Sequence, residues 1–191
     1  MDPKKSIRNK IKRERLLLSS ELQHHAAIAA WIQVIHEDFF QKAEKIAFYL
    51  AVHGELDPKP IMQTAWRHGK QTYLPVLNAQ EDGLSFYRYD PKMKMTQNKY
   101  GIWEPPLNTV EHLSSEALDL VFVPLVAFDL KGNRIGMGKG YYDRTFAFRS
   151  VQHNPLLVGL AYEFQKVDSI LTQETDIPLN IIVTNQKIYH M

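Results

Sequence analysis

The feature that most limits how this chain can fold is an apolar run, Leu120 to Phe128, that leads into a glycine-rich segment, Gly132 to Arg144. A short apolar run bounded by turn residues is typical of a strand buried on both faces. Glycines on alternate positions (Gly136, Gly138 and Gly140) allow backbone conformations that other residues avoid and let a ligand approach closely. A helix that begins after such a turn presents unpaired N–H groups to an anion. The segment therefore predicts an α/β fold with a phosphate-binding loop.

This segment differs from the two common nucleotide-binding motifs. A P-loop reads Gly, four residues, then Gly-Lys-Ser/Thr, whereas here Asn133 stands at the first glycine and Gly140 follows Lys139. The dinucleotide pattern Gly-x-Gly-x-x-Gly, begun at Gly136, meets Tyr141 in place of its last glycine. A plain glycine-rich turn with a solvated lysine is the simplest alternative interpretation.

Length and composition narrow the class of protein. A chain of 191 residues is long enough for one well-buried domain, which we expect to span residues 1–191. The absence of cysteine excludes disulfides, thiol catalysis and cysteine-based zinc sites. The start Met-Asp-Pro-Lys-Lys lacks the apolar core of a signal peptide, and the longest apolar run is far below the roughly 20 residues that span a bilayer. We expect a cytoplasmic protein with no membrane partner.

Seven Lys and Arg residues, with a single acid among them, precede residue 16. Ile7, Ile11 and Leu18 recur at helical spacing, which predicts an amphipathic helix with a buried apolar stripe. A basic helix of this kind can bind nucleic acid, but without a recognised binding motif we expect a solvated face and no nucleic-acid partner. Lys4 and Arg8 lie one turn apart and could together hold a polyphosphate.

Strands and helices alternate along the rest of the chain. Four helices are expected: Lys4–Leu18; one capped by Ser20 and Gln23; one capped by Asp57, with Pro58 in its first position, and ended by Gly69; and Gly140–Arg149. The expected strands are Ile46–Ala51, Thr72–Leu77, Leu84–Tyr89 after a turn at 80–83, one from Leu118, Leu156–Ala161 and Ile181–Thr184. This order predicts a Rossmann-like three-layer sandwich, a mostly parallel sheet with helices on both faces. The loops at Glu55 and Gly136 both follow apolar strands, so they can face one pocket at the carboxyl ends of the strands.

Residues 119–144, from Asp-Leu-Val-Phe-Val-Pro-Leu-Val-Ala-Phe-Asp to Gly-Met-Gly-Lys-Gly-Tyr-Tyr-Asp-Arg, closely resemble the signature of 5-formyltetrahydrofolate cyclo-ligases (methenyltetrahydrofolate synthetases). Shorter matches follow in the same order over nearly the whole chain: Lys4 and Arg8, Phe48–Leu50, Glu55–Asp57, Gly101–Pro105, Asp176 and Ile182–Thr184. The resemblance implies closure of 5-formyltetrahydrofolate to 5,10-methenyltetrahydrofolate, driven by ATP with Mg²⁺ and releasing ADP and phosphate.

The resemblance also implies the site residues. The ATP-binding positions are Lys4, Arg8, Arg134, Ile135, Gly136, Met137, Gly138, Lys139, Gly140, Tyr141 and Tyr142; the folate-binding positions are Leu50, Glu55, Trp103 and Tyr141; the metal positions are Asp143 and Asp176. We assign catalysis to Lys139, which would neutralise the transferring phosphoryl group, and to Arg134. Two carboxylates suit Mg²⁺, which keeps water and phosphate oxygens as its other ligands.

Each assignment has a plain structural alternative. Asp143 could stabilise a helix dipole, Asp176 could be a turn residue and Glu55 an exposed loop acid, while Leu50 and Trp103 could serve packing. A sugar-phosphate isomerase or transferase on a similar scaffold, needing no ATP, is the alternative enzyme. A nucleic-acid-binding module built on the first helix is the alternative outside enzymes. We expect a monomer that binds ATP and 5-formyltetrahydrofolate, and the sequence leaves open whether the folate is polyglutamylated.

Overall fold

The computed structural model describes residues 3–78, 83–97, 103–106, 110–150 and 154–191. Within this part of the chain, an 8-stranded sheet has the order β12-β11-β10-β7-β1-β2-β3-β6. Its strands are β1 (Lys45–Ala47), β2 (Gln71–Asn78), β3 (Gly83–Tyr89), β6 (His112–Leu113), β7 (Leu120–Pro124), β10 (Leu156–Ala161), β11 (Ile181–Thr184) and β12 (Ile188–His190). Neighbours from β11 to β2 are parallel, and β12, β3 and β6 pair antiparallel. The predicted α/β fold with a mostly parallel sheet is confirmed.

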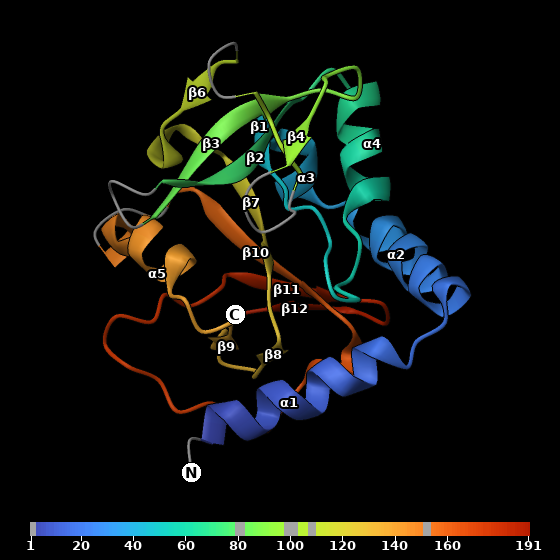
Figure 1. Ribbon diagram of the computed structural model, residues 1–191, viewed down its shortest axis with the longest axis vertical. Helices are drawn as coiled ribbons and strands as arrows, with labels where there is room; N and C mark the ends of the chain where they lie inside the picture. Colours follow the sequence, from blue (N-terminus) through green and yellow to red (C-terminus); the bar gives the residue numbers. More distant parts are fainter. Residues whose placement is uncertain (1–2, 79–82, 98–102, 107–109, 151–153) are drawn as a thin grey trace.

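Helices cover both faces of this sheet (Figure 1). On one face α2 (Ser20–Val34), α3 (Asp38–Lys42) and α4 (Lys59–Arg67) pack in one core cluster with Leu120 and Phe122 of β7. On the other face lie α5 (Tyr141–Thr145) and the 3-10 helix η2 (Ala147–Ser150). Phe146, between these two helices, is in one core cluster with Val121 and Val123 of β7. Successive strand residues point to opposite faces, so β7 is buried from both sides. The three layers of the predicted sandwich are therefore present.

Helix α1 (Pro3–Leu16) lies beyond the carboxyl end of β7, beside a small ribbon of β8 (Ala127–Phe128) and β9 (Arg134–Ile135) (Figure 1). Ile11 of α1 is buried against the ribbon in a separate core cluster, and Ile7 packs at its edge. The predicted apolar stripe of the first helix is confirmed. A second ribbon pairs β4 (Thr96–Gln97) with β5 (Trp103–Glu104), and the 3-10 helices η1 (Ser115–Ala117) and η3 (Glu163–Gln165) complete the elements.

Several predicted helix ends are wrong by one or two residues. Helix α1 ends at Leu16 rather than Leu18. The cap of α2 is Ser19, whose hydroxyl accepts a hydrogen bond from the Leu22 amide at 3.2 Å, so the predicted cap at Ser20 is wrong. Asp57 accepts from the Lys59 amide at 2.9 Å, but the N-cap residue of α4 is Pro58. Local side-chain hydrogen bonds compete at helix starts, so neighbouring polar residues are hard to rank from sequence.

Two longer predictions are corrected as well. The strand expected at Ile46–Ala51 stops at Ala47, and the helix expected at Gly140–Arg149 is split into α5 and η2. The split occurs at Phe146, which has φ −105° and is fully buried against Phe86, with ring centroids 5.9 Å apart. Burial of this aromatic ring outweighs the continuation of a short helix. Most of the predicted turn at 80–83, and residues 101–102 of the family match, lie outside the described residues.

Candidate active site

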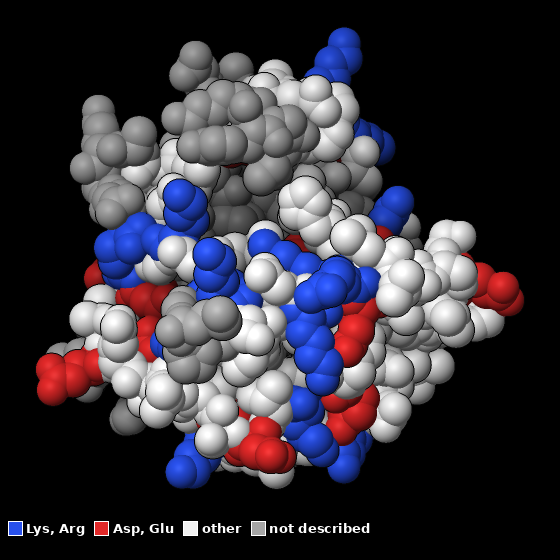
Figure 2. Space-filling model, turned by 60° about the horizontal axis from the view of Figure 1, so that its bottom comes forward, with Lys and Arg blue, Asp and Glu red and all other residues white. Residues whose placement is uncertain are grey.

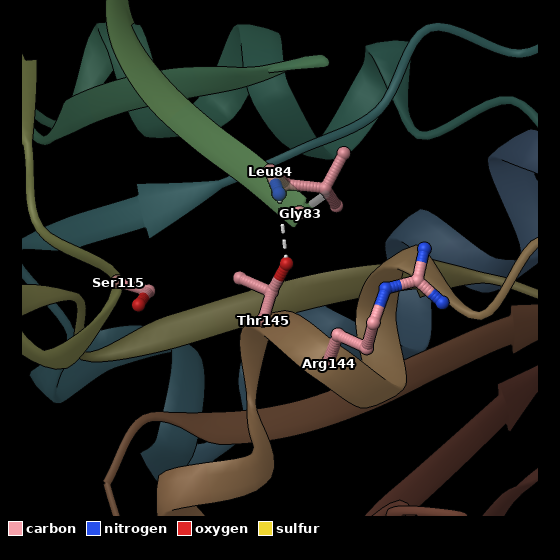
Figure 3. Close-up of a pocket in the computed structure, with 5 residues that line it drawn as sticks. All are labelled: Gly83, Leu84, Ser115, Arg144 and Thr145. Carbon is pink, nitrogen blue, oxygen red and sulfur yellow. Dashed lines mark hydrogen bonds between the residues drawn. The ribbon is translucent and has the colours of Figure 1, made fainter. Parts of the chain in front are cut away.

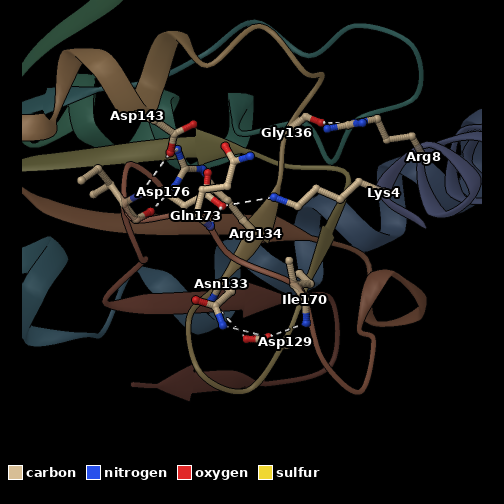
Figure 4. Close-up of polar contacts among 11 residues, drawn as sticks. Lys4, Arg8, Asp129, Asn133, Arg134, Gly136, Asp143, Ile170, Gln173 and Asp176 are labelled. Atoms are coloured by element: carbon tan, nitrogen blue, oxygen red, sulfur yellow. Dashed lines mark hydrogen bonds and ion pairs between the residues drawn. The ribbon is translucent and has the colours of Figure 1, made fainter. Parts of the chain in front are cut away.

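A buried carboxylate shapes the turn that carries the glycine segment. Asp129 is only 1% exposed and accepts hydrogen bonds from the amides of Lys131 (2.9 Å) and Asn133 (3.1 Å) and from the Asn133 side chain (2.9 Å). The Ile170 amide donates to the same carboxylate at 2.9 Å, which ties the turn to a segment far along the chain (Figure 4). Asp129 therefore sets where β9 and the glycines begin.

The glycines give this segment a backbone that other residues would not tolerate. Gly138 (φ +96°) and Gly140 (φ +67°) are in the left-handed region, and Gly140 is the N-cap of α5. A Cβ atom at Gly140 would lie 2.6 Å from the Arg144 guanidinium, and one at Gly138 would lie 3.6 Å from that of Arg8. The left-handed conformation therefore favours glycine at Gly140, whereas the Arg144 side chain could move away from a Cβ atom.

Helix α1 brings one predicted ATP-binding cation, Arg8, to the glycine segment and a second, Lys4, to Asp176. The Arg8 Nε donates to the Gly136 carbonyl at 2.9 Å, and the Lys4 Nζ lies 3.1 Å from Asp176 Oδ2 (Figure 4). Figure 2 looks onto the end of the molecule where α1 lies, and Lys and Arg side chains gather across the middle of this face. Other basic residues of α1, such as Lys5 and Arg13, are exposed. The helix thus places positive charge over residues that are distant in the sequence.

The two predicted metal carboxylates lie at one place in the structure. Asp143 Oδ1 is 2.7 Å from Arg134 Nη2 and accepts from the Ile177 amide at 3.1 Å; Arg134 Nη1 also donates to the Ile177 carbonyl. Asp176, the preceding residue, accepts through Oδ2 from the Gln173 amide at 3.0 Å. These contacts join the start of α5, β9 and the loop before β11 (Figure 4).

This arrangement fits a magnesium ion that is bound mainly by phosphate and water. Among the described residues, no hydrogen bond reaches Oδ2 of Asp143 or Oδ1 of Asp176, so each carboxylate has an oxygen left for a ligand. The described residues contain no cluster of three or more His, Cys, Asp or Glu that would form a closed metal site. Mg²⁺ commonly uses one or two carboxylates together with substrate phosphates. Asp143 and Asp176 are therefore a suitable donor set.

Glu55 occupies a buried position rather than an exposed loop. It is 8% exposed, its Oε2 accepts from the Val52 amide at 3.2 Å, and its Oε1 lies 3.9 Å from Arg15 Nη1. Burial raises the pKa of Glu55, which the Val52 amide and the Arg15 charge partly oppose. Burial also raises the pKa of the Tyr142 hydroxyl, and the charges of Glu55 and Arg134 both act on that hydroxyl. The charge of Glu55 therefore acts on Tyr142, a residue of the glycine segment.

The remaining predicted site residues differ in how far they are buried. Leu50 is half-buried at the edge of the core cluster that includes α2, and Tyr141 is half-buried with the Arg144 guanidinium 5.3 Å from its ring centroid. Trp103 in β5 is 52% exposed, which contradicts a core-packing role for its ring. Lys139 and Met137 are exposed on the glycine segment, whereas Ile135 is buried beneath it.

A pocket of about 220 Å³ adjoins this region (Figure 3). It lies between the start of β3 and α5 and is lined by Gly83, Leu84, Ser115, Arg144 and Thr145. The Leu84 amide donates to the Thr145 hydroxyl at 2.8 Å and fixes one wall. None of the predicted ATP, folate or metal residues is among these lining residues, so the pocket is beside the candidate site rather than at its centre.

The geometry agrees with a comparison against known families. A model of the 5-formyltetrahydrofolate cyclo-ligase family matches residues 1–185. The chain belongs to this family. A 5-formyltetrahydrofolate cyclo-ligase of Haemophilus influenzae is 40% identical over 178 residues, covering 92% of this chain and 94% of the relative. The corresponding protein of Escherichia coli K12 is 37% identical over 181 residues, covering 94% and 98%.

The structural comparison agrees as well. The solved structure of a 5,10-methenyltetrahydrofolate synthetase from Aquifex aeolicus has a TM-score of 0.83 and 32% sequence identity, and the alignment covers 98% of this chain and 92% of that one. The fold of this cyclo-ligase family member is therefore shared with solved relatives. None of the helices in its described part combines the length and apolar character needed to cross a bilayer.

Two residues of this cyclo-ligase family member escaped the sequence analysis. Arg15 is 1% exposed and contacts the Glu55 loop, and it lies four residues after Ile11 on the predicted apolar stripe. A charged residue on a buried helix face is a detectable signal, because such residues are rarely buried without a partner. Asp129 directly follows an apolar run and precedes a Gly-Asn turn, a pattern that predicts a side chain bonded to turn amides.

We expect Asp129→Asn to lower the free energy of unfolding by about 3 kcal/mol, because the amide nitrogen would replace one of two acceptor oxygens and face N–H donors in a buried site. Urea denaturation would measure the loss. Asp38→Asn is a matched control, since that carboxylate is exposed and, within the part of the chain that the structure describes, its ion pair is with Lys42 on the same helix. Equal stabilities for the two variants would show that the Asp129 hydrogen bonds do not hold the turn.

Proposed function

We propose that this protein catalyses the ATP- and Mg²⁺-dependent cyclisation of 5-formyltetrahydrofolate to 5,10-methenyltetrahydrofolate, with release of ADP and phosphate. The observation that carries this proposal is the meeting of α1 with the glycine segment. Arg8 bonds to the Gly136 carbonyl and Lys4 pairs with Asp176, so cations, glycine backbone and carboxylates lie at one edge of the sheet. Family membership supports the choice of folate as the second substrate.

The proposed chemistry explains why these groups are needed together. A formamide carbonyl is a poor electrophile and its oxygen is a poor leaving group. The oxygen of the formyl group attacks the γ-phosphorus of ATP and ADP leaves, so the formyl oxygen becomes part of a phosphate ester on an iminium-like carbon. The neighbouring amine then attacks that carbon and gives up its proton, the carbon–oxygen bond breaks, and the phosphate departs with that proton as the ring closes. Phosphoryl transfer depends mainly on positioning and charge neutralisation.

Each group has a defined part in this scheme. Lys4 and Arg8 hold the polyphosphate, with the backbone of Gly136 to Gly140 against its oxygens. Lys139 is exposed beside this backbone and is assigned to neutralise the transferring phosphoryl group. Asp143 and Asp176 would bind Mg²⁺, which neutralises phosphate charge when bound. Arg134 is 6% exposed in its side chain and fixes Asp143, so it acts at the phosphate through the orientation of that carboxylate.

An absorbance assay for the methenyl product, with ATP, Mg²⁺ and 5-formyltetrahydrofolate each omitted in turn, tests the proposal. We expect product only when all three are present. Full activity without ATP would contradict the proposal and favour an isomerase or transferase that uses the glycine segment for a substrate phosphate. The monomeric state, the cytoplasmic location and the absence of a nucleic-acid partner stay predictions, which sedimentation and salt-dependent binding assays would test.

Glu55→Gln should weaken binding of 5-formyltetrahydrofolate by about one to two powers of ten, because it removes a buried charged acceptor for pterin N–H groups. Calorimetry would measure folate affinity and, separately, the affinity for a non-hydrolysable ATP analogue, which we expect to be nearly unchanged. Glu21→Gln, a change at an exposed position of α2, is the control. Equal losses for both ligands would mean that the Glu55 loop is structural.

A further inference from the structure

Arg15 is an arginine buried inside the protein with most of its hydrogen-bonding capacity unused. Its Nη2 donates to the Leu125 carbonyl, at the carboxyl end of β7. Within the described residues, its Nε and Nη1 have no hydrogen-bond partner. Buried N–H groups are normally paired, so unpaired donors at this depth call for an explanation. Among the described residues, Arg15 forms an ion pair with Glu55, whose Oε1 is 3.9 Å from Nη1, too far for a hydrogen bond and close enough for a charge interaction.

The Glu55 loop is seated directly on this arginine. Gly54 has φ +71°, and a Cβ atom there would lie 3.1 Å from the Arg15 carbonyl oxygen, so the loop backbone packs against α1 at this residue. The Val52 amide binds Oε2 of Glu55. No described residue donates a hydrogen bond to Oε1, so that oxygen is an acceptor without a donor among the described residues.

We propose that Arg15 is a positioning residue for folate recognition: its buried guanidinium keeps the Glu55 carboxylate ionised and aimed, so that Oε1 accepts from the N–H groups of the pterin. This inference rests on the proposed function, in which Glu55 binds the folate. Arg15 is 1% exposed and acts through Glu55 without touching the substrate. Removing one partner of a buried charge pair leaves the other charge uncompensated, which changes its protonation.

The direction of the pH effect follows from the surroundings of Glu55. Burial raises the pKa of Glu55, whereas Arg15, His53 and Lys12 oppose that rise. Other titratable groups of the described residues in this neighbourhood are the hydroxyls of Tyr49, Tyr142 and Tyr162, the carboxylate of Asp57 and the guanidinium of Arg134. Without Arg15 the pKa of Glu55 rises further. Folate binding, which needs the carboxylate, is then lost at a higher pH and recovers as the pH is raised.

A double-mutant cycle on folate affinity tests this role. Calorimetry with 5-formyltetrahydrofolate across pH would compare the parent, Arg15→Met, Glu55→Gln and the double variant. We expect Arg15→Met to bind folate about tenfold more weakly at pH 7, the size of coupling that contacting charged residues show, and to regain affinity as the pH rises. In the Glu55→Gln background the same change should have little effect. Arg13→Met is the matched control, because Arg13 is an exposed arginine of α1 whose Nε donates to the Asn9 carbonyl of the same helix.

The outcomes separate this inference from the proposed function. If Glu55→Gln binds folate like the parent, the assignment of Glu55 fails whatever Arg15 does. If Glu55→Gln loses affinity but Arg15→Met costs the same in both backgrounds, Arg15 does not act through Glu55 and the inference is overturned. Should Arg15→Met fail to fold, Arg15→Lys would be measured in its place. Partial folate affinity, a smaller shift in the pH dependence of that affinity and parent-like binding of the ATP analogue would support the inference. Equal loss for both ligands at every pH overturns it.

Discussion

Lys139→Met should reduce single-turnover formation of the methenyl product by about 10²–10³-fold, the usual cost of one preorganised transition-state contact. Lys139 is exposed between Gly138 and Gly140, both in the left-handed region, and it makes no ion pair with a described residue. Its charge is therefore available to a phosphoryl group. Methionine keeps an unbranched side chain of similar length and removes only the charge. Backbone N–H groups of the segment would still hold the phosphates, so affinity for a non-hydrolysable ATP analogue should fall much less.

Lys131→Met is the matched control for this test, because Lys131 is an exposed lysine in the turn before β9 and outside the glycine segment. We expect it to react like the parent. If Lys139→Met also reacts like the parent, Lys139 is a solvated loop residue. The neutralising charge would then have to come from Arg8, which already contacts the Gly136 carbonyl, or from Arg134.

Asp143→Asn should raise the Mg²⁺ concentration needed for half-maximal activity by at least about a hundredfold. Even residues that only orient a metal ligand change affinity or activity by roughly 10–100-fold, and Asp143 is assigned as a ligand. The amide keeps the shape of the side chain and can still accept from the Ile177 amide, so the fold should persist. Activity measured against Mg²⁺ at saturating ATP would report the change.

Thermal unfolding of the same variant separates the metal role from a helix-dipole role. Asp168→Asn, at an exposed carboxylate, is the control for the loss of one negative charge. A lower unfolding temperature for Asp143→Asn with unchanged Mg²⁺ dependence would show that this carboxylate serves only α5 and the Arg134 ion pair. That result would leave Asp176 as the remaining metal candidate.

Two strands were predicted to the residue, for a physical reason. The bounds of β10 and β11 are those that their apolar runs predict, because strands buried on both faces must be apolar throughout. The helix after the glycine segment was predicted too long, because its local pattern does not record that Phe146 is drawn into the core beside Phe86. Helix length here depends on packing partners that are distant in the sequence.

The identity of the residues in the glycine segment, the apolar strand before it and the order of the family matches are all local properties. They were enough to predict the α/β fold and the family, while the phosphate-binding role of the segment stays a prediction. The sequence did not predict the sheet order or the contacts between distant segments, since these depend on which surfaces pack together. Tertiary structure alone brings Lys4 to Asp176 and Arg15 to Glu55. It also brings Arg134 and Asp143 together beside Ile177. Each of these pairs stands on different elements, and burial of apolar faces such as that of Ile11 decides their separation.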